Sequence, residues 1–380
     1  MNQPTIGLVL TGGGARGAYQ AGVLTAISEI QGQDLHIPIV TGVSAGAINA
    51  ALLASHPGPF SETVRDLREA WLGLTMENVF KIESRGLFRA LIRWLWLLST
   101  HLGSDQLEVR GFLNTQPLLE YLKHHADLSG IRRNLESGRL SALALTATSY
   151  ATGLTINFIE TSDLRPGWKR AGRQGVHTTI DYEHVMASSA LPLIFPAIQI
   201  NNSFYGDGSL RLQTPLAPAI HLGADKLLVI SVRYKRTPEE EILAQVQGYP
   251  PPAQVLGMLL NAVFLDALET DLERARRINH TLSLLGSEKR RASGMKRMEL
   301  IVLRPSLDLG KLAADIKADM PGLLKVIVRG LGTQYSKTPD FLSYLLFEQT
   351  YVKSLMELGY RDTLLRQPEI EHFLAIDPAA

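Results

Sequence analysis

Residues 36–55 read HIPIVTGVSAGAINAALLAS and combine a short apolar run, a glycine-bounded turn and an alanine-rich stretch. The run HIPIV predicts a buried strand, and AINAALLAS predicts a helix directly after the turn. Residues 5–30 repeat this order, because the strand-like TIGLVL precedes a glycine turn and a stretch with helical spacing through Tyr19, Val23 and Ile27. Two strand–turn–helix units in succession favour a parallel sheet covered by helices on both faces.

The rest of the chain continues this pattern and departs from it twice. Further strand candidates are LSALALTATSY (140–150), LTINFIE (154–160), FPAIQI (195–200) and DKLLVISVR (225–233). Helical patterns without a strand fill residues 56–135, which indicates an insertion over the sheet. Residues 253–365 are again mostly helical around one strand-like run, MELIVLRPS. The sequence thus predicts an α/β core with a helical insertion and a helical C-terminal extension.

Composition excludes several classes of function. The chain has 380 residues, with 38 Lys and Arg against 37 Asp and Glu, so no general positive field is available to hold nucleic acid. It contains no cysteine, which removes disulfides, thiolate chemistry and cysteine-based metal sites. The beginning MNQPTIGLVLTGGG lacks the features of a signal peptide, and no apolar run approaches the roughly 20 residues of a membrane-spanning helix. These features predict a cytoplasmic protein.

The turn GVSAG matches the pattern G-x-S-x-G, with Ser44 between Gly42 and Gly46. In hydrolases this pattern places a strained serine at a strand-to-helix junction, where its hydroxyl stands clear of the backbone. The predicted strand before Ser44 and the predicted helix after it provide that context. A nucleophilic Ser44 is therefore the favoured interpretation, and a plain strand-to-helix turn is the alternative.

A serine nucleophile needs hydrogen-bond donors for the oxyanion that forms on the attacked carbonyl, and TGGGARGAY supplies candidates. Gly12, Gly13 and Gly14 precede a predicted helix, so their N–H groups can point outward beside its positive end. Arg16 would add charge or hold the loop in shape. The glycine loop is thus a candidate oxyanion hole.

The same loop also spells the dinucleotide-binding pattern G-x-G-x-x-G through Gly12, Gly14 and Gly17. That function requires an acidic residue after the second strand to bind the ribose, and the nearest acid, Asp34, comes before that strand. A P-loop is excluded because no G-K-[ST] follows the glycines. We therefore expect no cofactor at this loop.

A general base is also needed, and histidine is the usual choice. His221 and His280 occur late in the chain, but each lies in a helical pattern without a turn around it. Asp207 stands between Gly206 and Gly208 after FPAIQI, which is how a turn presents an acid to a cleft. The alternative for Asp207 is the tip of an Asp-Gly hairpin.

Together these motifs resemble those of the patatin-like phospholipase family, which has a loop G-G-G-x-R-G, a turn G-x-S-x-G and an acid motif D-G-[GAS]. The chain contains them in that order as GGGARG, GVSAG and DGS, and ASSALP at residues 187–192 resembles the family's A-S-x-x-x-P element. The resemblance covers roughly residues 5–235. The later stretches VFLDALETDLERARRIN and LSYLLFEQTYVKSLMELGYRD look like the helical extension of bacterial members.

The resemblance implies a three-layer α/β/α sandwich with a mainly parallel sheet. It places a patatin-like catalytic domain at residues 1–235, with the helical insertion at about 56–135. A mainly helical extension then occupies residues 236–380.

The resemblance also implies that Ser44 is the nucleophile and Asp207 its only base, a dyad without histidine. The amides of residues 12–14 would form the oxyanion hole, and Arg16 matches the loop arginine. Ser209 stands where the D-G-G form of the acid motif has its third glycine. The implied activity is hydrolysis of acyl esters of phospholipids, lysophospholipids or related lipids, without a metal.

A carboxylate has an ordinary pKa of about 4, so it is a weak base for a serine hydroxyl. This predicts slow turnover and activity that persists below the pH range in which histidine titrates. Loss of activity in His221→Ala or His280→Ala as complete as in Asp207→Asn would reject the dyad.

Residues 81–103, KIESRGLFRALIRWLWLLSTHLG, indicate contact with a membrane surface. Arg85, Arg89 and Arg93 recur every four residues on one helical face with Trp96 beside them, and apolar residues occupy the opposite face. Basic residues with tryptophan at the boundary suit a helix that lies in the membrane interface. The alternative is a cap helix packed on the core with its arginines in water.

The remaining candidates receive plainer roles. The histidines outside these motifs lack metal-ligand spacing, so we expect no metal site. Ser188 and Ser189 have no glycine turn around them, and we expect them to line the substrate cleft. The sequence therefore predicts a serine acyl hydrolase that acts on lipids, with a catalytically silent lipid-binding or regulatory protein of the same fold as the alternative.

Overall fold

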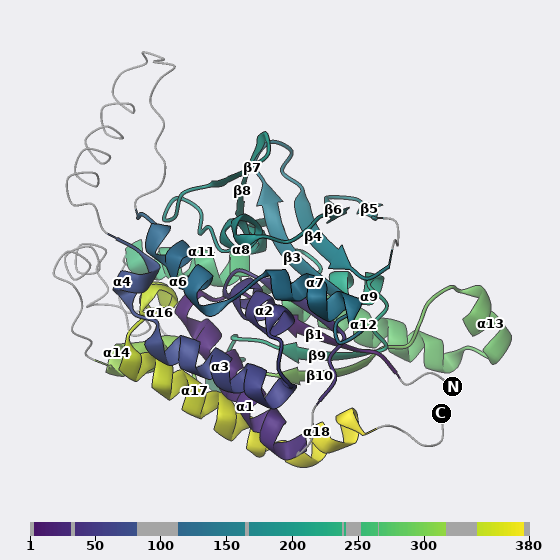
Figure 1. Ribbon diagram of the computed structural model, residues 1–380. Helices are drawn as coiled ribbons and strands as arrows, with labels where there is room; N and C mark the ends of the chain where they lie inside the picture. Colours follow the sequence, from purple (N-terminus) through teal and green to yellow (C-terminus); the bar gives the residue numbers. More distant parts are fainter. Residues whose placement is uncertain are drawn as a thin grey trace.

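The computed structural model describes residues 4–31, 35–81, 113–163, 167–237, 239–240, 252–264, 266–316 and 340–375. Its strands form a mixed, mostly parallel sheet with the order β10-β9-β1-β2-β3-β4-β6-β5, and β7 and β8 pair beside β3 (Figure 1). The strands are β1 (Ile6–Leu10), β2 (Ile39–Val43), β3 (Ala142–Ser149), β4 (Thr155–Thr161), β5 (Lys169–Arg170), β6 (Arg173–His177), β7 (Ile198–Ile200), β8 (Ser203–Asp207), β9 (Lys226–Ile230) and β10 (Glu299–Leu303).

The helices alternate with these strands in the first part of the chain, as the sequence predicts. β1 leads through a 3-10 turn into α1, and β2 leads directly into α2. The helical elements are η1 (Gly14–Gly17), α1 (Ala18–Gln31), α2 (Ala45–Ser55), α3 (Phe60–Gly73), α4 (Met76–Val79), α6 (Gln116–His125), α7 (Ser129–Glu136), α8 (Tyr182–Ser188), η2 (Gly208–Arg211), α9 (Ala217–His221), α11 (Pro252–Phe264), α12 (Asp266–Leu284), α13 (Ser287–Ala292), α14 (Leu309–Asp315), α16 (Asp340–Leu345), α17 (Gln349–Leu364) and α18 (Gln367–Leu374).

The centre of the sheet is parallel. β1 pairs in parallel with β2 on one side and with β9 on the other, and the parallel order continues from β2 to β3 and from β9 to β10. Antiparallel pairs occur beyond this centre, where β3 meets β4 and β8, and where β7 and β8 form a hairpin. The strands β5, β6 and β8 are additions to the strands that the sequence predicts.

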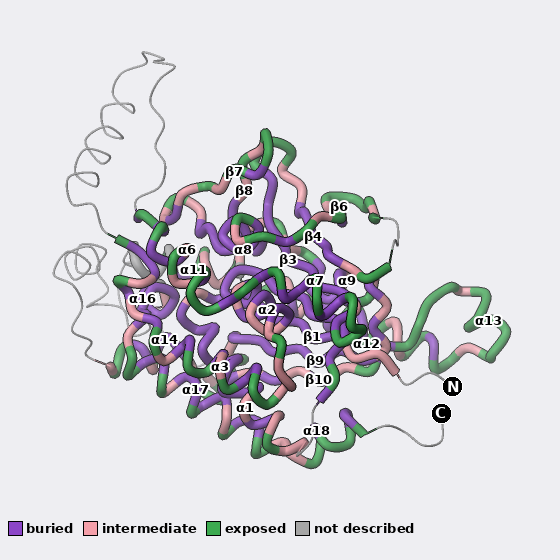
Figure 2. Tube along the Cα trace, in the orientation of Figure 1, coloured by how far each residue is buried: buried purple, intermediate pink, exposed green. Residues whose placement is uncertain are grey.

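Side chains that alternate across β1 divide the core into two halves. Leu8 and Leu10 belong to a cluster with side chains of α1, α2, α3 and α17. Val9 belongs to a second cluster with side chains of α9 and α12. Figure 2 shows the central strands buried between these helices. The fold is therefore an α/β/α sandwich with helices on both faces of the sheet, as the sequence predicts.

The predicted insertion at residues 56–135 is helical where the structure describes it, through α3, α4, α6 and α7. Lys81 and Asn114 pair in a β-bridge at the two ends of the part that is not described. The predicted interfacial stretch 81–103 lies outside the described residues except for Lys81. Among the helices that the structure describes, none has the length and apolar character needed to cross a membrane.

The C-terminal region contributes to the same core as the rest of the chain. The run MELIVLRPS forms β10, which pairs in parallel with β9. α17 packs against α1, where the Tyr19 hydroxyl donates to Asp362 at 3.2 Å and the Tyr360 hydroxyl donates to Glu29 at 2.6 Å. The boundary at residue 235 stays a prediction about domain organisation, and the extension after it supplies both a strand and a helix of the sandwich.

Candidate active site

Ser44 lies at the junction of β2 and α2 in a strained backbone conformation. Its φ is 55° and its ψ is −128°, a left-handed φ that costs a non-glycine residue about 1–3 kcal/mol. The flanking glycines make this turn possible, because a β-carbon at Gly42 would lie 2.2 Å from the Gly46 carbonyl oxygen, and one at Gly46 would lie 2.2 Å from the Leu10 carbonyl oxygen. The conformation is the one expected for a serine at a nucleophile turn.

Asp207 is the last residue of β8 and the N-cap of η2. Its Oδ1 accepts a hydrogen bond from the Ser209 N–H at 2.9 Å. The hairpin alternative for Asp207 is wrong, because the chain turns between β7 and β8 at Asn201 and Asn202, where Asn201 has a φ of 53°. Asp207 instead is the last residue of β8, the second strand of this hairpin, and lies at the end away from the hairpin turn.

The register of the sheet brings Ser44 and Asp207 together. β2 runs parallel to β3 and ends with Val43 opposite Thr146. β8 runs antiparallel to β3 and ends with Asp207 opposite Ala147, the next residue of β3. β4 pairs along the other edge of β3, so β2 and β8 both lie along the same edge of β3 and meet there end to end. The residue after Val43 therefore lies beside Asp207.

The Asp207 carboxyl is completely buried. Burial raises the pKa of Asp207 to about 7, and the Ser44 hydroxyl together with the amide and hydroxyl of Ser209 partly offsets this rise. Within the described residues, no donor satisfies Oδ2 with a well-formed hydrogen bond, so this oxygen is free to receive a proton. The expectation that activity persists below the range of histidine used the pKa of a carboxyl in water. The raised pKa of Asp207 moves the expected acidic limit of activity toward neutral pH, and the pH–activity profile stays a prediction.

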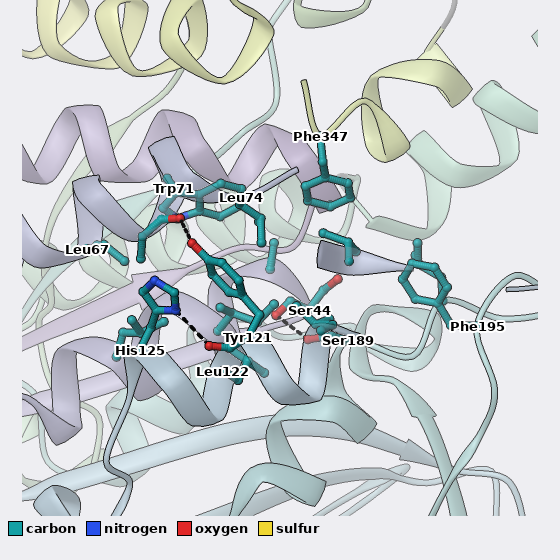
Figure 3. Close-up of a pocket in the computed structure, with 18 residues that line it drawn as sticks. Ser44, Leu67, Trp71, Leu74, Tyr121, Leu122, His125, Ser189, Phe195 and Phe347 are labelled. Carbon is teal, nitrogen blue, oxygen red and sulfur yellow. Dashed lines mark hydrogen bonds between the residues drawn. The ribbon is translucent and has the colours of Figure 1, made fainter. Parts of the chain in front are cut away.

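Among the described residues, the candidate histidines lie away from Ser44. His221 stacks on Trp168 with ring centroids 4.8 Å apart, and both His221 and His280 belong to helices on the face of the sheet that Val9 occupies. His125 lines the pocket described below but lies on the side away from Ser44, where its Nδ1 bonds to the Tyr121 carbonyl oxygen at 2.9 Å (Figure 3). Within the described parts of the chain, Asp207 is the acid that the sheet register brings beside Ser44.

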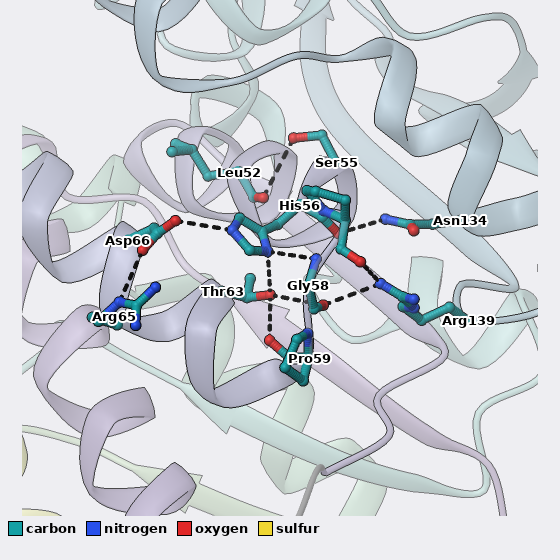
Figure 4. A network of polar contacts seen from close by, with 11 residues as sticks. Leu52, Ser55, His56, Gly58, Pro59, Thr63, Arg65, Asp66, Asn134 and Arg139 are labelled. Atoms are coloured by element: carbon teal, nitrogen blue, oxygen red, sulfur yellow. Dashed lines mark hydrogen bonds and ion pairs between the residues drawn. The ribbon is translucent and has the colours of Figure 1, made fainter.

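A set of hydroxyl, histidine and carboxylate side chains lies between α2 and α3, apart from Ser44 and Asp207 (Figure 4). His56 Nε2 meets Asp66 Oδ2 at 3.0 Å, and Thr63 Oγ1 is 2.9 Å from His56 Nδ1. The Gly58 N–H already donates to Nδ1 at 3.0 Å, and the Thr63 hydroxyl also bonds to the Pro59 carbonyl oxygen at 2.9 Å. These contacts hold the turn that begins α3, so the set is a structural network.

Ser188 and Ser189 have a role that the sequence did not reveal. The Ser188 hydroxyl accepts the Ser44 N–H at 3.1 Å and donates to the Thr146 carbonyl oxygen at 2.5 Å. The Ser189 hydroxyl bonds to the carbonyl oxygens of Ser44 at 3.1 Å and Val185 at 3.0 Å. Ser189 also lines the pocket, as expected, whereas Ser188 is completely buried.

The glycine loop packs directly against the nucleophile. A β-carbon at Gly12 would lie 2.8 Å from both the Ser44 β-carbon and Ser209 Oγ, so only glycine permits this approach. The N–H groups of Gly12, Gly13 and Gly14 donate to no other group within the described parts of the chain. Their predicted role as an oxyanion hole stays a prediction, and Gly14 also borders the pocket.

Arg16 fixes this loop to the C-terminal region. Its guanidinium is buried and donates through Nε to Ser343 Oγ and through Nη2 to Asp340 Oδ1, both at 2.8 Å. It also lies over the Tyr344 ring, with Cζ 4.3 Å from the ring centroid. The predicted support of the loop by Arg16 thus has partners on α16.

Ser44 opens onto a narrow pocket. Side chains of α2, α3 and α6 form most of its wall, and its lining is almost entirely apolar. In Figure 3, Ser44 and Ser189 lie together on the side of Phe195, whereas Leu67 lies on the opposite side. The pocket has the apolar character of a site for an apolar ligand.

Comparison with known proteins identifies a family and a set of similar structures. The model of the family described as patatin-like phospholipase matches residues 8–220. VipD from Legionella pneumophila is 13% identical, with 97% of this chain and 67% of that chain covered and a TM-score of 0.36. Human GIVD cytosolic phospholipase A2 is 14% identical, with 98% and 60% covered and a TM-score of 0.47, so the chain spans less than two thirds of its length. Among curated proteins, none matches the chain.

Proposed function

The chain belongs to the patatin-like phospholipase family, and on this premise we propose that it hydrolyses acyl esters of phospholipids, lysophospholipids or related lipids. Family membership supports lipid acyl hydrolysis in general. The observation that carries the proposal for this chain is the position of Ser44, which lies at one end of an apolar pocket with the buried carboxyl of Asp207 beside it.

In the proposed reaction, Ser44 Oγ attacks the carbonyl carbon of the ester while its proton passes to Asp207. The tetrahedral intermediate then expels the alcohol, which takes the proton from Asp207, and the acyl group stays on Ser44. Water attacks this acyl ester and gives a proton to Asp207. The fatty acid leaves as Ser44 Oγ regains that proton.

The electrostatics of the site support these roles. A general base works best when its pKa lies near the working pH, and burial gives Asp207 a pKa of about 7. We assign the amides of Gly12, Gly13 and Gly14 to the oxyanion, because this loop meets Ser44 at Gly12 and its amides donate to no group among the described residues. Arg16 holds this loop and does not meet the substrate, because its charge is paired with Asp340.

The pocket supports an acyl chain as the part of the substrate that is recognised. An aliphatic chain that enters beside Ser44 would run between α2, α3 and α6 toward Leu67. Each methylene that leaves water there contributes about 0.8 kcal/mol, so the pocket selects for lipid esters over short water-soluble ones. The head group would remain outside this wall.

The site of contact with the membrane is a separate part of the proposal. We assign peripheral contact to residues 81–103 on the basis of their arginine and tryptophan pattern. The proposed cytoplasmic location follows from the composition, which contains no cysteine. Binding to anionic vesicles should weaken as the salt concentration rises. It should also weaken in the double variant that carries both Arg89→Glu and Arg93→Glu. Equal binding by this double variant would remove the segment from consideration.

A fluorophosphonate probe separates the enzyme from a silent lipid-binding protein of the same fold. Such a probe forms a covalent bond only with an activated serine. We expect a single adduct on Ser44, identified by peptide mass spectrometry, and none in Ser44→Ala. A wild-type protein that binds lipid vesicles but stays unlabelled would support the silent binder.

A further inference from the structure

Two consecutive serines hold the peptide groups on both sides of the nucleophile. The Ser44 N–H donates to Ser188 Oγ, and the Ser44 carbonyl oxygen accepts from Ser189 Oγ, each at 3.1 Å (Figure 3 shows Ser189). Both hydroxyls come from the end of α8, which is 144 residues away in the sequence. The Ser44 carbonyl oxygen also accepts the N–H groups of Ala47 at 2.8 Å and Ile48 at 3.3 Å, at the start of α2. No side chain within the described residues caps α2 at its first turn, so the two serine hydroxyls are the side-chain restraints on the peptide groups of Ser44.

The hydroxyls of Ser188 and Ser189 also contact backbone carbonyl oxygens outside the Ser44 turn. Ser188 Oγ donates to the Thr146 carbonyl oxygen, and Thr146 is the residue of β3 that lies between the ends of β2 and β8. The Ser189 hydroxyl has one proton, which it shares between the carbonyl oxygens of Ser44 and of Val185 in α8. Asp207 is linked to the same segment, because its N–H donates to the Ala190 carbonyl oxygen at 2.9 Å. One short segment, residues 188–190, thus contacts the backbone of both Ser44 and Asp207.

We propose that Ser188 and Ser189 are positioning residues that hold Ser44 in its left-handed conformation at a fixed place relative to Asp207. This inference rests on the proposed function, since it assigns the two serines to the reaction of Ser44. A left-handed serine persists only when its surroundings determine its conformation. Without the two hydroxyls, the Ser44 N–H would lose its side-chain acceptor and the Ser44 carbonyl oxygen would keep only its bonds from the start of α2. The strained turn would then relax, and Oγ would move away from the line of attack.

The plain alternative is that both hydroxyls only satisfy buried polar groups and support the fold. In that case, their loss would lower thermal stability without a specific effect on the chemistry of Ser44. Ser55 provides the matched control, because it lies at the other end of α2, is 3% exposed and donates to the Leu52 carbonyl oxygen at 3.4 Å. Eleven residues of helix place it roughly 16 Å from Ser44.

The test measures the rate at which a fluorophosphonate probe labels Ser44 in Ser188→Ala, Ser189→Ala, Ser189→Thr and Ser55→Ala. The same four variants are assayed on a soluble nitrophenyl ester, and their thermal midpoints are recorded. We expect labelling and kcat to fall by roughly ten- to a hundredfold in the two alanine variants at Ser188 and Ser189, with KM nearly unchanged, because a small displacement of a reacting group has effects of this size.

The controls keep the outcomes apart. Ser189→Thr should restore the labelling rate because it keeps the hydroxyl, and Ser55→Ala should label at the wild-type rate even if its thermal midpoint falls. If Ser188→Ala does not fold, the comparison of Ser189→Ala with Ser189→Thr decides. Wild-type labelling rates in Ser189→Ala would overturn the inference. Failure of the proposed function has a different signature, which is the absence of labelling in the wild-type protein itself.

Discussion

Arg16 and Asp340 form an ion pair between residues 324 positions apart, with Nη2 and Oδ1 at 2.8 Å and the guanidinium buried. The pair joins the glycine loop beside Ser44 to α16, in the C-terminal region of the chain. Arg16 is 3% exposed, and the same guanidinium bonds to Ser343 and stacks on Tyr344. The predicted helical extension is therefore part of the support of the candidate active site.

Removal of one partner from this ion pair should destabilise the protein and impair the site. We expect Asp340→Asn to lower the free energy of unfolding by about 3 kcal/mol, because it leaves a buried guanidinium without its counter-charge. Urea denaturation measures this loss. Glu136→Gln removes the exposed partner of Arg132 and should cost less than about 1 kcal/mol. Equal effects of the two substitutions would contradict the support that we assign to Arg16.

The acidic limb of the pH–rate profile should follow Asp207. Since kcat/KM reports the free enzyme, it should fall below pH of about 7, where the buried carboxyl becomes protonated and cannot accept the Ser44 proton. Temperature separates this limb from a histidine limb, because ionisation of a carboxyl has little enthalpy whereas ionisation of an imidazole has a large one. A limb that shifts strongly with temperature would point to histidine.

Ser209 should affect the pH at which the acidic limb of the pH–rate profile falls. Its amide bonds to Asp207, and its hydroxyl lowers the pKa of Asp207 without a well-formed hydrogen bond among the described residues. Ser209→Gly would remove only the hydroxyl. The acidic limb of this variant should therefore lie at a higher pH than in the wild-type protein. Ser55→Ala is the control that should leave the limb in place. An unchanged limb in Ser209→Gly would show that the hydroxyl does not act on Asp207.

The ionised Asp207 carboxyl should also lower the free energy of unfolding at neutral and alkaline pH. Its folded pKa is raised above the ordinary value of 3.8, so the folded state holds the proton more tightly and the free energy of unfolding falls as pH rises from about 4 to about 7. The difference corresponds to roughly 4 kcal/mol above pH 7. Asp207→Asn should remove this penalty and melt at a higher temperature than the wild-type protein at pH 8, with little difference at pH 4. Parallel stability curves for the two proteins would contradict a buried, ionised Asp207.

The apolar pocket should set the preferred length of the acyl chain. Leu67 lies on the side of the pocket away from Ser44, so Leu67→Phe would shorten the space available (Figure 3). We expect kcat/KM to fall for long-chain esters by about fourfold for each methylene excluded and to stay unchanged for short ones. Leu135→Phe, at a buried position on α7 outside the pocket, is the matched control. A uniform loss at all chain lengths would show that the chain does not reach Leu67.

Local sequence was enough to predict the parts of the site that lie within single turns. The G-x-S-x-G turn requires Gly42 and Gly46 for steric reasons that any such turn imposes, and Asp207 between glycines is a comparable local signal. The alternation of strands and helices up to residue 55 is equally local. For this reason the sandwich and the two candidate catalytic residues could be inferred before the fold was known.

The remaining features depend on contacts between distant segments. The bond of Ser188 to Ser44 and the bond of Arg16 to Asp340 follow from sheet register and helix packing, which no short pattern encodes. The raised pKa of Asp207 arises from complete burial, and the sequence offered only the ordinary value for a carboxyl in water. β8 was missed because SFYGD is short and its alternation is weak.

Release of fatty acids from a mixed lipid extract, followed by mass spectrometry, tests the central claim most directly. The wild-type protein should release free fatty acids, and Ser44→Ala and Asp207→Asn should each lower the rate by roughly a thousandfold or more, because the two side chains act as a unit. Release by Ser44→Ala at the wild-type rate, from a folded and purified protein, would contradict the assignment of Ser44 as the nucleophile and with it the proposed hydrolase.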